Sequence, residues 1–121
     1  MPSSVLLIDS DAFLGGMYAN ALRSAGFEVR HETTGHEGLQ AVLDRPDVVV
    51  LDVLMPRMAA FEILERVQAN ASAYPPIIVM TSLAHRRDID RCLRLGVSRY
   101  LVKTHHTPED LTQQVCDVLP H

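Results

Sequence analysis

The sequence predicts an α/β fold: a doubly wound parallel sheet of five strands in the order 2-1-3-4-5, with five helices. Three observations predict this fold. Short apolar runs alternate strictly with segments of helical spacing, which favours a parallel sheet with right-handed crossovers. Four of the runs are continuously apolar, as strands covered on both faces are. The remaining run, residues 27–31, alternates apolar and polar residues and is expected at an edge, which favours the stated order.

The first half of the chain supplies three strands and two helices. The apolar run at 5–8 precedes a helix that ends at Gly26, a residue type favoured where helices stop. The apolar face of this helix consists of Leu14, Met17, Ala21, Leu22 and Ala25. After the edge strand, Thr34 and Glu37 fit a capping box for the second helix, and a buried strand follows at 48–51. The apolar residues of the second helix are Leu39, Val42 and Leu43.

The second half supplies two strands, at 77–80 and 100–102, and three helices. Gly96 is expected to end the fourth helix, and Thr107 followed by Pro108 predicts the start of the fifth. The apolar residues that mark these helices are Phe61, Leu64 and Val67 in the third, Ile89, Cys92 and Leu93 in the fourth, and Leu111, Val115 and Val118 in the fifth.

Two adjacent glycines, Gly15 and Gly16, interrupt the first predicted helix. Each costs about 1 kcal/mol relative to alanine in a helix interior, so a reason for them is needed. Because the chain has no GxGxxG pattern, we interpret them as a packing feature and not as a phosphate-binding loop.

Composition limits the function further. The chain has 121 residues, 47% hydrophobic and 21% charged, so we expect one domain over residues 1–121 with a single core. A net charge of −4 without a long run of one sign gives no indication of direct binding to nucleic acid or a membrane. The start resembles no signal peptide, and two cysteines are too few for a disulfide framework. A reduced, cytoplasmic protein is the simplest expectation.

Polar residues follow the four buried strands at their carboxyl ends. These residues are Asp9, Asp52, Thr81 and Lys103, and Lys103 is the only lysine of the chain. Ligands of open α/β sheets bind just outside these strand ends, where the strand order reverses. The sequence therefore predicts that two carboxylates, a hydroxyl and an ammonium converge on one crevice.

This set of groups suits phosphoryl transfer. Carboxylates without His or Cys ligand spacing favour a hard cation, and Mg²⁺ fits best. A carboxylate can also act as the nucleophile that accepts a phosphoryl group. Because phosphoryl transfer needs mainly positioning and charge neutralisation, Mg²⁺ with a lysine would be sufficient, and Thr81 could bond a phosphoryl oxygen.

Over nearly its whole length the chain resembles the receiver domain of two-component response regulators. The resemblance rests on four segments together: VLLIDSD, VVVLDVLMP, IIVMTS and YLVK. It implies a flavodoxin-like fold with the strand order given above. It also implies a signalling switch that takes a phosphoryl group from the phosphohistidine of a histidine kinase or phosphotransfer protein. Such a switch supports only its own phosphotransfer and dephosphorylation, and it acts on a downstream protein or output domain.

The resemblance assigns roles to particular residues. Asp52 would be the phosphoacceptor, and Thr81 and Lys103 would bind the phosphoryl group. Mg²⁺ would be held by Asp9, Asp52 and the backbone carbonyl of Leu54, with Ser10 or Asp11 as further candidates, although Asp11 also suits a helix N-cap. Tyr100 would change rotamer as Thr81 moves. A homodimer through the face between the fourth and fifth helices is a further hypothesis, to which Arg87, Arg91 and Arg94 could contribute.

The chain also departs from the family pattern. Ser10 replaces the second of two usual acids, so we expect weaker Mg²⁺ binding than in a typical receiver. Residues 57–60 replace the frequent Gly-x-Asp-Gly. Leu54 and Leu83 should hinder an attacking water, which predicts a long-lived phosphoryl state.

Three alternatives remain open from the sequence. The chain could be a receiver-like binding module that acts without phosphorylation, as Ser10 suggests. VLLIDSDAF also resembles the DxD motif of haloacid-dehalogenase-type phosphatases, in which Asp9 would be the nucleophile and Asp11 the general acid. A flavin-binding role is more distant, because no loop rich in Ser, Thr and Gly follows the first strand.

Overall fold

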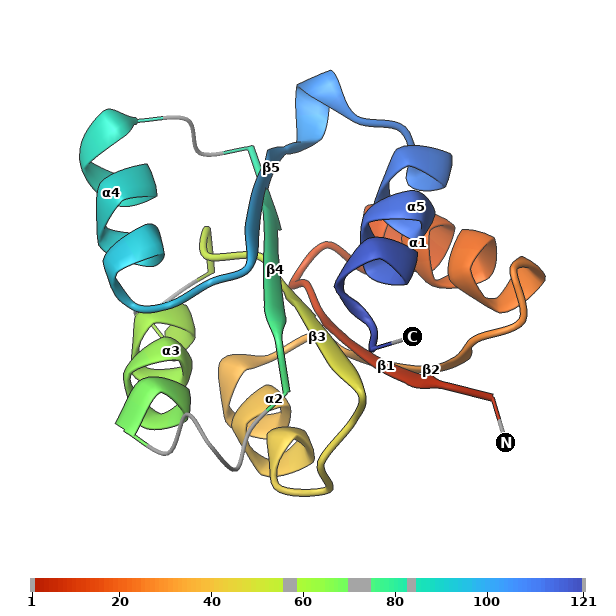
Figure 1. Cartoon of the computed structure of the whole chain (residues 1–121), viewed down its shortest axis with the longest axis horizontal. Coiled ribbons are helices and arrows are strands. Elements are labelled where there is room, and N and C mark those ends of the chain that lie inside the picture. Colours follow the sequence, from red (N-terminus) through yellow and green to blue (C-terminus); the bar gives the residue numbers. More distant parts are fainter. Residues whose placement is uncertain (1, 56–58, 70–74, 83–84, 121) are drawn as a thin grey trace.

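The computed structural model describes residues 2–55, 59–69, 75–82 and 85–120. It contains one parallel sheet in the order β2-β1-β3-β4-β5, as predicted (Figure 1). The strands are β1 (Ser4–Ile8), β2 (Glu28–Glu32), β3 (Val48–Leu51), β4 (Ile77–Thr81) and β5 (Arg99–Val102). The helices are α1 (Ala12–Ser24), α2 (Gly35–Val42), α3 (Ala59–Ala69), α4 (Arg86–Arg94) and α5 (Pro108–Val118), with a short 3₁₀ helix at Lys103–His105. The predicted α/β class is confirmed.

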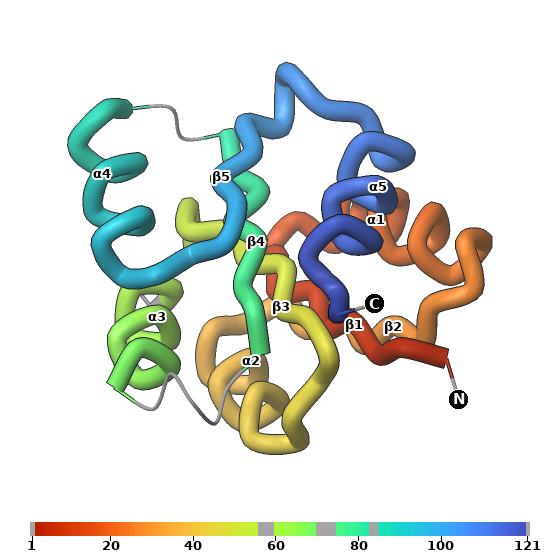
Figure 2. The backbone as a smooth tube through the Cα atoms, viewed as in Figure 1, coloured from red at the N-terminus to blue at the C-terminus, as the bar shows by residue number. Residues whose placement is uncertain are grey.

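Helices cover both faces of the sheet. Helices α1 and α5 lie side by side on one face, and α2, α3 and α4 lie on the other (Figures 1 and 2). Alternate residues of β1 therefore enter two separate cores: Leu6 and Ile8 join the cluster under α2 and α3, whereas Val5 and Leu7 join the cluster under α1 and α5. A strand buried on both faces must be apolar at every position, which explains the continuous runs.

Strand β2 forms one edge of the sheet and pairs only with β1. It begins one residue later than predicted, and its residues are exposed or half-buried. The alternation of polar and apolar residues at 27–31 therefore indicated an edge strand correctly. Because every β2 side chain is at least partly accessible, polar groups such as His31 are tolerated there.

Side-chain caps fix the starts of three helices. Asp11 caps α1 by accepting a hydrogen bond from Leu14 N (2.9 Å), and Thr107 and Asp110 form a complete capping box at α5. The predicted capping box of α2 is only half formed: Thr34 Oγ1 accepts from Glu37 N (3.1 Å), but the Glu37 carboxylate bonds the Thr34 hydroxyl and not its backbone N–H. Gly26 and Gly96, with φ of 98° and 84°, end α1 and α4 in the left-handed region.

Some predicted helix faces are wrong in detail. Met17 in α1 and Ala25 directly after it are exposed, whereas Leu22 is buried as predicted. The other buried residues of α1 are Gly15, Tyr18 and Ala19. Leu43 after α2 and Leu93 in α4 also point to solvent, with 58% and 51% exposed. A prediction from apolar spacing counts large residues such as leucine and methionine, and it does not count glycine, which allows close packing. The predicted buried face of α1 therefore included Met17 and omitted Gly15. The predicted faces of α3 and α5 are confirmed.

The two glycines of α1 differ in their surroundings. A Cβ on Gly15 would lie 2.4 Å from His31 Nε2, whereas a Cβ on Gly16 would meet nothing within 4 Å. The packing interpretation is therefore confirmed for Gly15 and wrong for Gly16. Within the described ranges, none of the helices combines the length and apolar character needed to cross a membrane.

Candidate functional site

Three charged side chains meet at the carboxyl ends of the central strands. Asp9 follows β1, Asp52 follows β3 and Lys103 follows β5. The Lys103 ammonium donates to Asp9 Oδ2 at 2.7 Å and to Asp52 Oδ2 at 2.9 Å. The structure therefore brings these groups into direct contact although they lie up to 94 residues apart in the chain. Parallel strands make this possible because all their carboxyl ends lie at the same edge of the sheet.

The backbone holds both carboxylates in the same way. Asp9 Oδ1 accepts from Asp11 N (2.9 Å), and Asp52 Oδ1 accepts from Leu54 N (2.8 Å), in each case two residues further on. Each acid thus has one oxygen bonded to its own turn and the other bonded to Lys103. Both are nearly inaccessible, with 1% of Asp9 and 5% of Asp52 exposed. Buried acids need such partners, since an unpaired buried charge is very costly.

Lys103 remains charged in this environment. Its side chain is only 10% exposed, and burial by itself would lower the pKa of the ammonium. The hydrogen bonds to Asp9 and Asp52, together with the charges of these acids, outweigh that effect, and the pKa of Lys103 is raised above its ordinary value of 10.5. One ammonium against two carboxylates leaves the buried cluster with an excess negative charge, which suits binding of a further cation.

A cavity of about 390 Å³ opens above this cluster. Its lining residues are Ser10, Asp11, Leu14, Tyr18, Asp52, Leu54, Ser82, Lys103 and Thr104. Asp52 therefore faces open space and is within reach of a ligand. Asp9 does not line the cavity, which places it beneath Asp52 and Lys103 as a supporting charge.

Tyr18 belongs to this site, and the sequence analysis did not identify it. Its ring centroid lies 5.8 Å from Lys103 Nζ, within the range of a cation–π contact. Burial, opposed in part by the Lys103 charge, raises the pKa of the Tyr18 phenol. The sequence could have indicated Tyr18, because it lies four residues after Leu14 and residues four apart share one face of a helix.

Thr81 and Tyr100 occupy neighbouring strands. Thr81 is the last residue of β4 and is fully buried, and Tyr100 lies in β5 beside Val79. Because side chains alternate along a strand, Thr81 and Val79 project to the same face of the sheet, and Tyr100 packs into the core cluster that contains Val79. Burial is the main cause that raises the pKa of Tyr100 to about 12. The two predicted switch residues therefore share one face, the face covered by α4.

The other predicted metal ligands lie around the cavity. Ser10 is exposed, and the Asp11 carboxylate already caps α1. Leu54 is 54% exposed at the cavity. Leu83 and the residues at 57 and 58, which depart from the family pattern, lie outside the described residues.

The oxygen groups at this site fit Mg²⁺ bound by few protein ligands. Among the described residues there is no group of three or more His, Cys, Asp or Glu side chains that could hold a metal ion. Mg²⁺ usually binds one or two carboxylates and keeps several waters, so two acids with a backbone carbonyl would suffice. The candidate ligands are Asp9, Asp52, the Leu54 carbonyl and the Ser10 hydroxyl. Among the described contacts each carboxylate oxygen accepts one hydrogen bond, and such an oxygen has two lone pairs.

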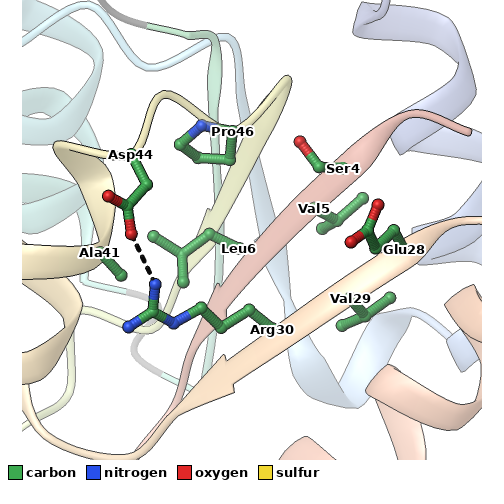
Figure 3. A pocket seen from close by; sticks show the side chains of 9 residues that line it. All are labelled: Ser4, Val5, Leu6, Glu28, Val29, Arg30, Ala41, Asp44 and Pro46. Carbon is green, nitrogen blue, oxygen red and sulfur yellow. Dashed lines mark hydrogen bonds and ion pairs between the residues drawn. The ribbon is translucent and has the colours of Figure 1, made fainter. Parts of the chain in front are cut away.

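A second pocket, of about 240 Å³, lies at the opposite end of the strands (Figure 3). Arg30 points into it and forms ion pairs with Asp44 (2.7 Å) and Glu32 (2.9 Å). Because two carboxylates already neutralise this guanidinium, the pocket offers no free positive charge to an anion. The chemistry-bearing groups thus gather at the other end of the sheet.

Comparison with known proteins identifies the family. The model of the response regulator receiver domain matches residues 5–116. The chain belongs to this family. Receiver domains are signalling switches rather than classical enzymes, so the interpretation of Asp9 as the nucleophile of a haloacid-dehalogenase-type phosphatase loses its support.

Solved receiver domains share this fold over almost their whole length. The chemotaxis protein CheY4 of Vibrio cholerae superposes with a TM-score of 0.87 at 29% identity, covering 98% of this chain and 100% of that one. A response regulator receiver protein from Burkholderia phymatum gives a TM-score of 0.81 at 30% identity, covering 96% and 94% of the two chains. The flavodoxin-like architecture implied by the sequence is therefore confirmed.

The curated relatives are longer proteins that contain a similar domain. A protein-glutamate methylesterase/protein-glutamine glutaminase of Myxococcus xanthus is 36% identical over 107 residues, which is 85% of this chain but 30% of that protein. The DNA-binding response regulator MtrA of Mycobacterium tuberculosis is 30% identical over 116 residues, 95% of this chain and 50% of the relative. The chain spans half or less of these proteins, so the likeness concerns the receiver domain and not the activities in their names.

Proposed function

We propose that this receiver domain is a phosphorylation switch whose phosphoacceptor is Asp52. The supporting observation is the contact of Lys103 with both Asp9 and Asp52 at the floor of an open cavity. Asp52 is the only acid of this cluster that lines the cavity among the described residues, so an incoming phosphoryl group can reach it but not Asp9. The proposed donor is the phosphohistidine of a histidine kinase or phosphotransfer protein, in the cytoplasm.

The chain's own groups would direct the transfer. One Asp52 oxygen forms a bond to phosphorus as the bond from phosphorus to the donor histidine nitrogen breaks, and that nitrogen keeps the electron pair. The N–H of Leu54 and the ammonium of Lys103 orient the carboxylate for attack. Mg²⁺, when bound by Asp9, Asp52 and the Leu54 carbonyl, supplies positive charge to the phosphoryl oxygens. Lys103 can shift from the two acids to the phosphoryl group.

The phosphoryl group would then change the surface near α4. Thr81 would turn its hydroxyl towards a phosphoryl oxygen, and Tyr100 would move into the space that this opens. Since both side chains belong to the face under α4, the change reaches that helix and a downstream protein or output domain. A homodimer through the face between α4 and α5 is one outcome of such a change. Leu54 at the cavity mouth would slow hydrolysis by hindering water.

The decisive experiment locates the phosphoryl group. We expect acetyl phosphate with Mg²⁺ to place one phosphoryl group on Asp52, detected by mass spectrometry of peptides. Asp52→Asn should abolish the modification, and Lys103→Ala should slow it strongly because it removes the only ammonium at the site. Asp44→Asn, which alters an exposed acid far from the site, is the matched control and should be modified normally. A phosphoryl group on Asp9 would refute the proposal.

The second candidate is a receiver-like binding module that acts without phosphorylation. The exposed hydroxyl of Ser10, where the family usually has an acid, favours it because it weakens the cation site. Beryllofluoride with Mg²⁺ separates the two functions, since only a switch should show NMR shift changes at Thr81 and Tyr100. No response at any concentration of Mg²⁺ would favour the binding module.

A further inference from the structure

A histidine on the edge strand reaches the backbone of the site. His31 lies in β2, and its Nε2 is 3.1 Å from the carbonyl oxygen of Asp9, 22 residues earlier in the chain. A carbonyl can only accept a hydrogen bond, so Nε2 must carry the proton and act as donor. This contact is not required by the sheet, because β2 and β1 already pair through their backbones.

The imidazole fits there because residue 15 is glycine. A Cβ on Gly15 would lie 2.4 Å from His31 Nε2, 2.5 Å from His31 Cε1 and 3.4 Å from Asp9 Cβ. Any larger residue at this place in α1 would displace the ring. The glycine on α1 and the histidine on β2 thus form a matched pair, which explains a residue that costs the helix about 1 kcal/mol.

Asp9 is bonded at all four of its polar atoms. Its N donates to Glu32 O (3.0 Å), Oδ1 accepts from Asp11 N (2.9 Å), Oδ2 accepts from Lys103 (2.7 Å), and O accepts from His31 (3.1 Å). Only two of these partners are side chains: Lys103, which belongs to the site, and His31. Among the described contacts of Asp9, His31 is therefore the one side-chain restraint that lies outside the cavity.

We propose that His31, seated against Gly15, is a positioning residue for the phosphorylation site. Its hydrogen bond to the Asp9 carbonyl fixes the turn that follows β1, and with it the Asp9 carboxylate and the adjacent Ser10. The inference rests on the proposed function, because positioning matters only if Asp9 and Ser10 serve a cation and a phosphoryl group. Partners that orient metal ligands typically change metal affinity by about 10- to 100-fold when they are removed.

Two matched pairs of variants test the proposal. His31→Phe removes the donor and keeps a ring, whereas His31→Gln keeps an N–H at a similar reach. Gly15→Ala places a methyl group where the His31 ring lies, whereas Gly16→Ala adds the same methyl group where nothing lies within 4 Å. For each folded variant, at one fixed pH, the measurements are Mg²⁺ affinity by calorimetry, the beryllofluoride response, and the backbone amide shifts of Asp9, Ser10 and Asp11.

We expect His31→Phe and Gly15→Ala to weaken Mg²⁺ binding about ten-fold and to shift the three amides. His31→Gln and Gly16→Ala should stay within about two-fold of the wild type. Equal affinities in all four variants, or a His31→Gln variant as weak as His31→Phe, would overturn the proposal. If Gly15→Ala does not fold, the His31 pair decides alone.

The failure of the proposed function has a different signature. In that case the wild type itself would neither bind Mg²⁺ and beryllofluoride nor accept a phosphoryl group. A direct readout of the contact remains, since the ¹⁵N spectrum of the wild-type imidazole should show a proton on Nε2. A ring protonated only on Nδ1 would overturn the His31 contact whatever the function.

Discussion

At the scale of single residues, the site is short of positive charge. Lys103 bridges two buried acids, and among the described residues no other cationic side chain contacts either acid. Asp11, which could add a third acid, already caps α1, and Ser10 contributes a neutral hydroxyl at the cavity. We therefore expect the charge at position 10 to affect the affinity of the proposed site for Mg²⁺.

Ser10→Asp should strengthen Mg²⁺ binding by about ten-fold or more. Two unit charges about 4 Å apart interact by roughly 1 kcal/mol in water and about 4 kcal/mol near a protein surface. The double charge of Mg²⁺ doubles this energy, and 1.4 kcal/mol is a factor of ten. Calorimetric titration of both proteins measures the change. Without Mg²⁺ the variant should unfold at lower urea concentration, because it adds a like charge beside Asp52, and Mg²⁺ should restore its stability.

The control for this variant is Asn20→Asp, which makes the same change of charge on the exposed side of α1. It should leave Mg²⁺ affinity unchanged. If Ser10→Asp bound Mg²⁺ no better than the wild type, the side chain of residue 10 would not reach the cation.

At the scale of elements, strands were easier to predict than helix faces. Buried strands such as β3 are recognised by a continuous apolar run, and each strand boundary was predicted within one residue. The face of α1 was misplaced because Gly15 and Tyr18 pack inward for reasons that lie elsewhere in the chain: His31 on β2 and Lys103 after β5. Apolar periodicity carries no information about such partners.

Helix α4 shows the same limit. Arg91 has partners within the molecule that its spacing did not predict: its guanidinium lies 3.9 Å from the centroid of the Phe61 ring and 3.3 Å from Glu65 Oε1, both on α3. Gln68 of α3 also donates to the carbonyl of Arg94 (3.0 Å). Arg87 and Arg94 are exposed, and the Arg91 side chain is 40% exposed despite its contacts with α3. A contribution of these arginines to a dimer face stays a prediction.

Arg91→Ala should therefore loosen α4 from α3. A cation–π contact and a surface ion pair each contribute about 0.5–1 kcal/mol, so we expect a loss of roughly 1 kcal/mol in the free energy of unfolding by urea. Arg87→Ala removes an exposed arginine from the same helix and should change it by less than about 0.5 kcal/mol. Equal losses in the two variants would show that the contacts with α3 do not stabilise the fold.

At the scale of the whole molecule, topology places the site. The half-exposed second strand predicted the order 2-1-3-4-5. Because the strands are parallel, the ends of β1, β3 and β5 lie at one edge of the sheet, where Asp9, Asp52 and Lys103 are in contact. The roles of these residues stay predictions. The hydrogen bond from His31 to the Asp9 carbonyl could not be predicted, because it depends on the packing of α1 against β2.

The stability of this arrangement can be followed through its two cysteines. Cys92 on α4 is fully buried in the core under α3 and α4, and Cys116 on α5 is partly accessible. Burial is the main cause that raises the pKa of the Cys92 thiol from 9.0 to about 11. The folded protein therefore binds this proton more tightly than the unfolded chain. Its contribution to stability is complete below pH 9 and is lost as the pH rises through about 11.

At pH 8 we expect a thiol reagent to label Cys116 quickly and Cys92 at least about a hundred-fold more slowly, since the thiolate is the reactive form. Cys116→Ser should remove the fast phase and leave the slow one. Because Cys92 packs between the sheet and α4, its labelling should require the opening of that core, and its rate should rise with urea in parallel with global unfolding. A slow phase that does not respond to urea would mean that α4 opens alone, and α4 would then be the least stable layer of the molecule.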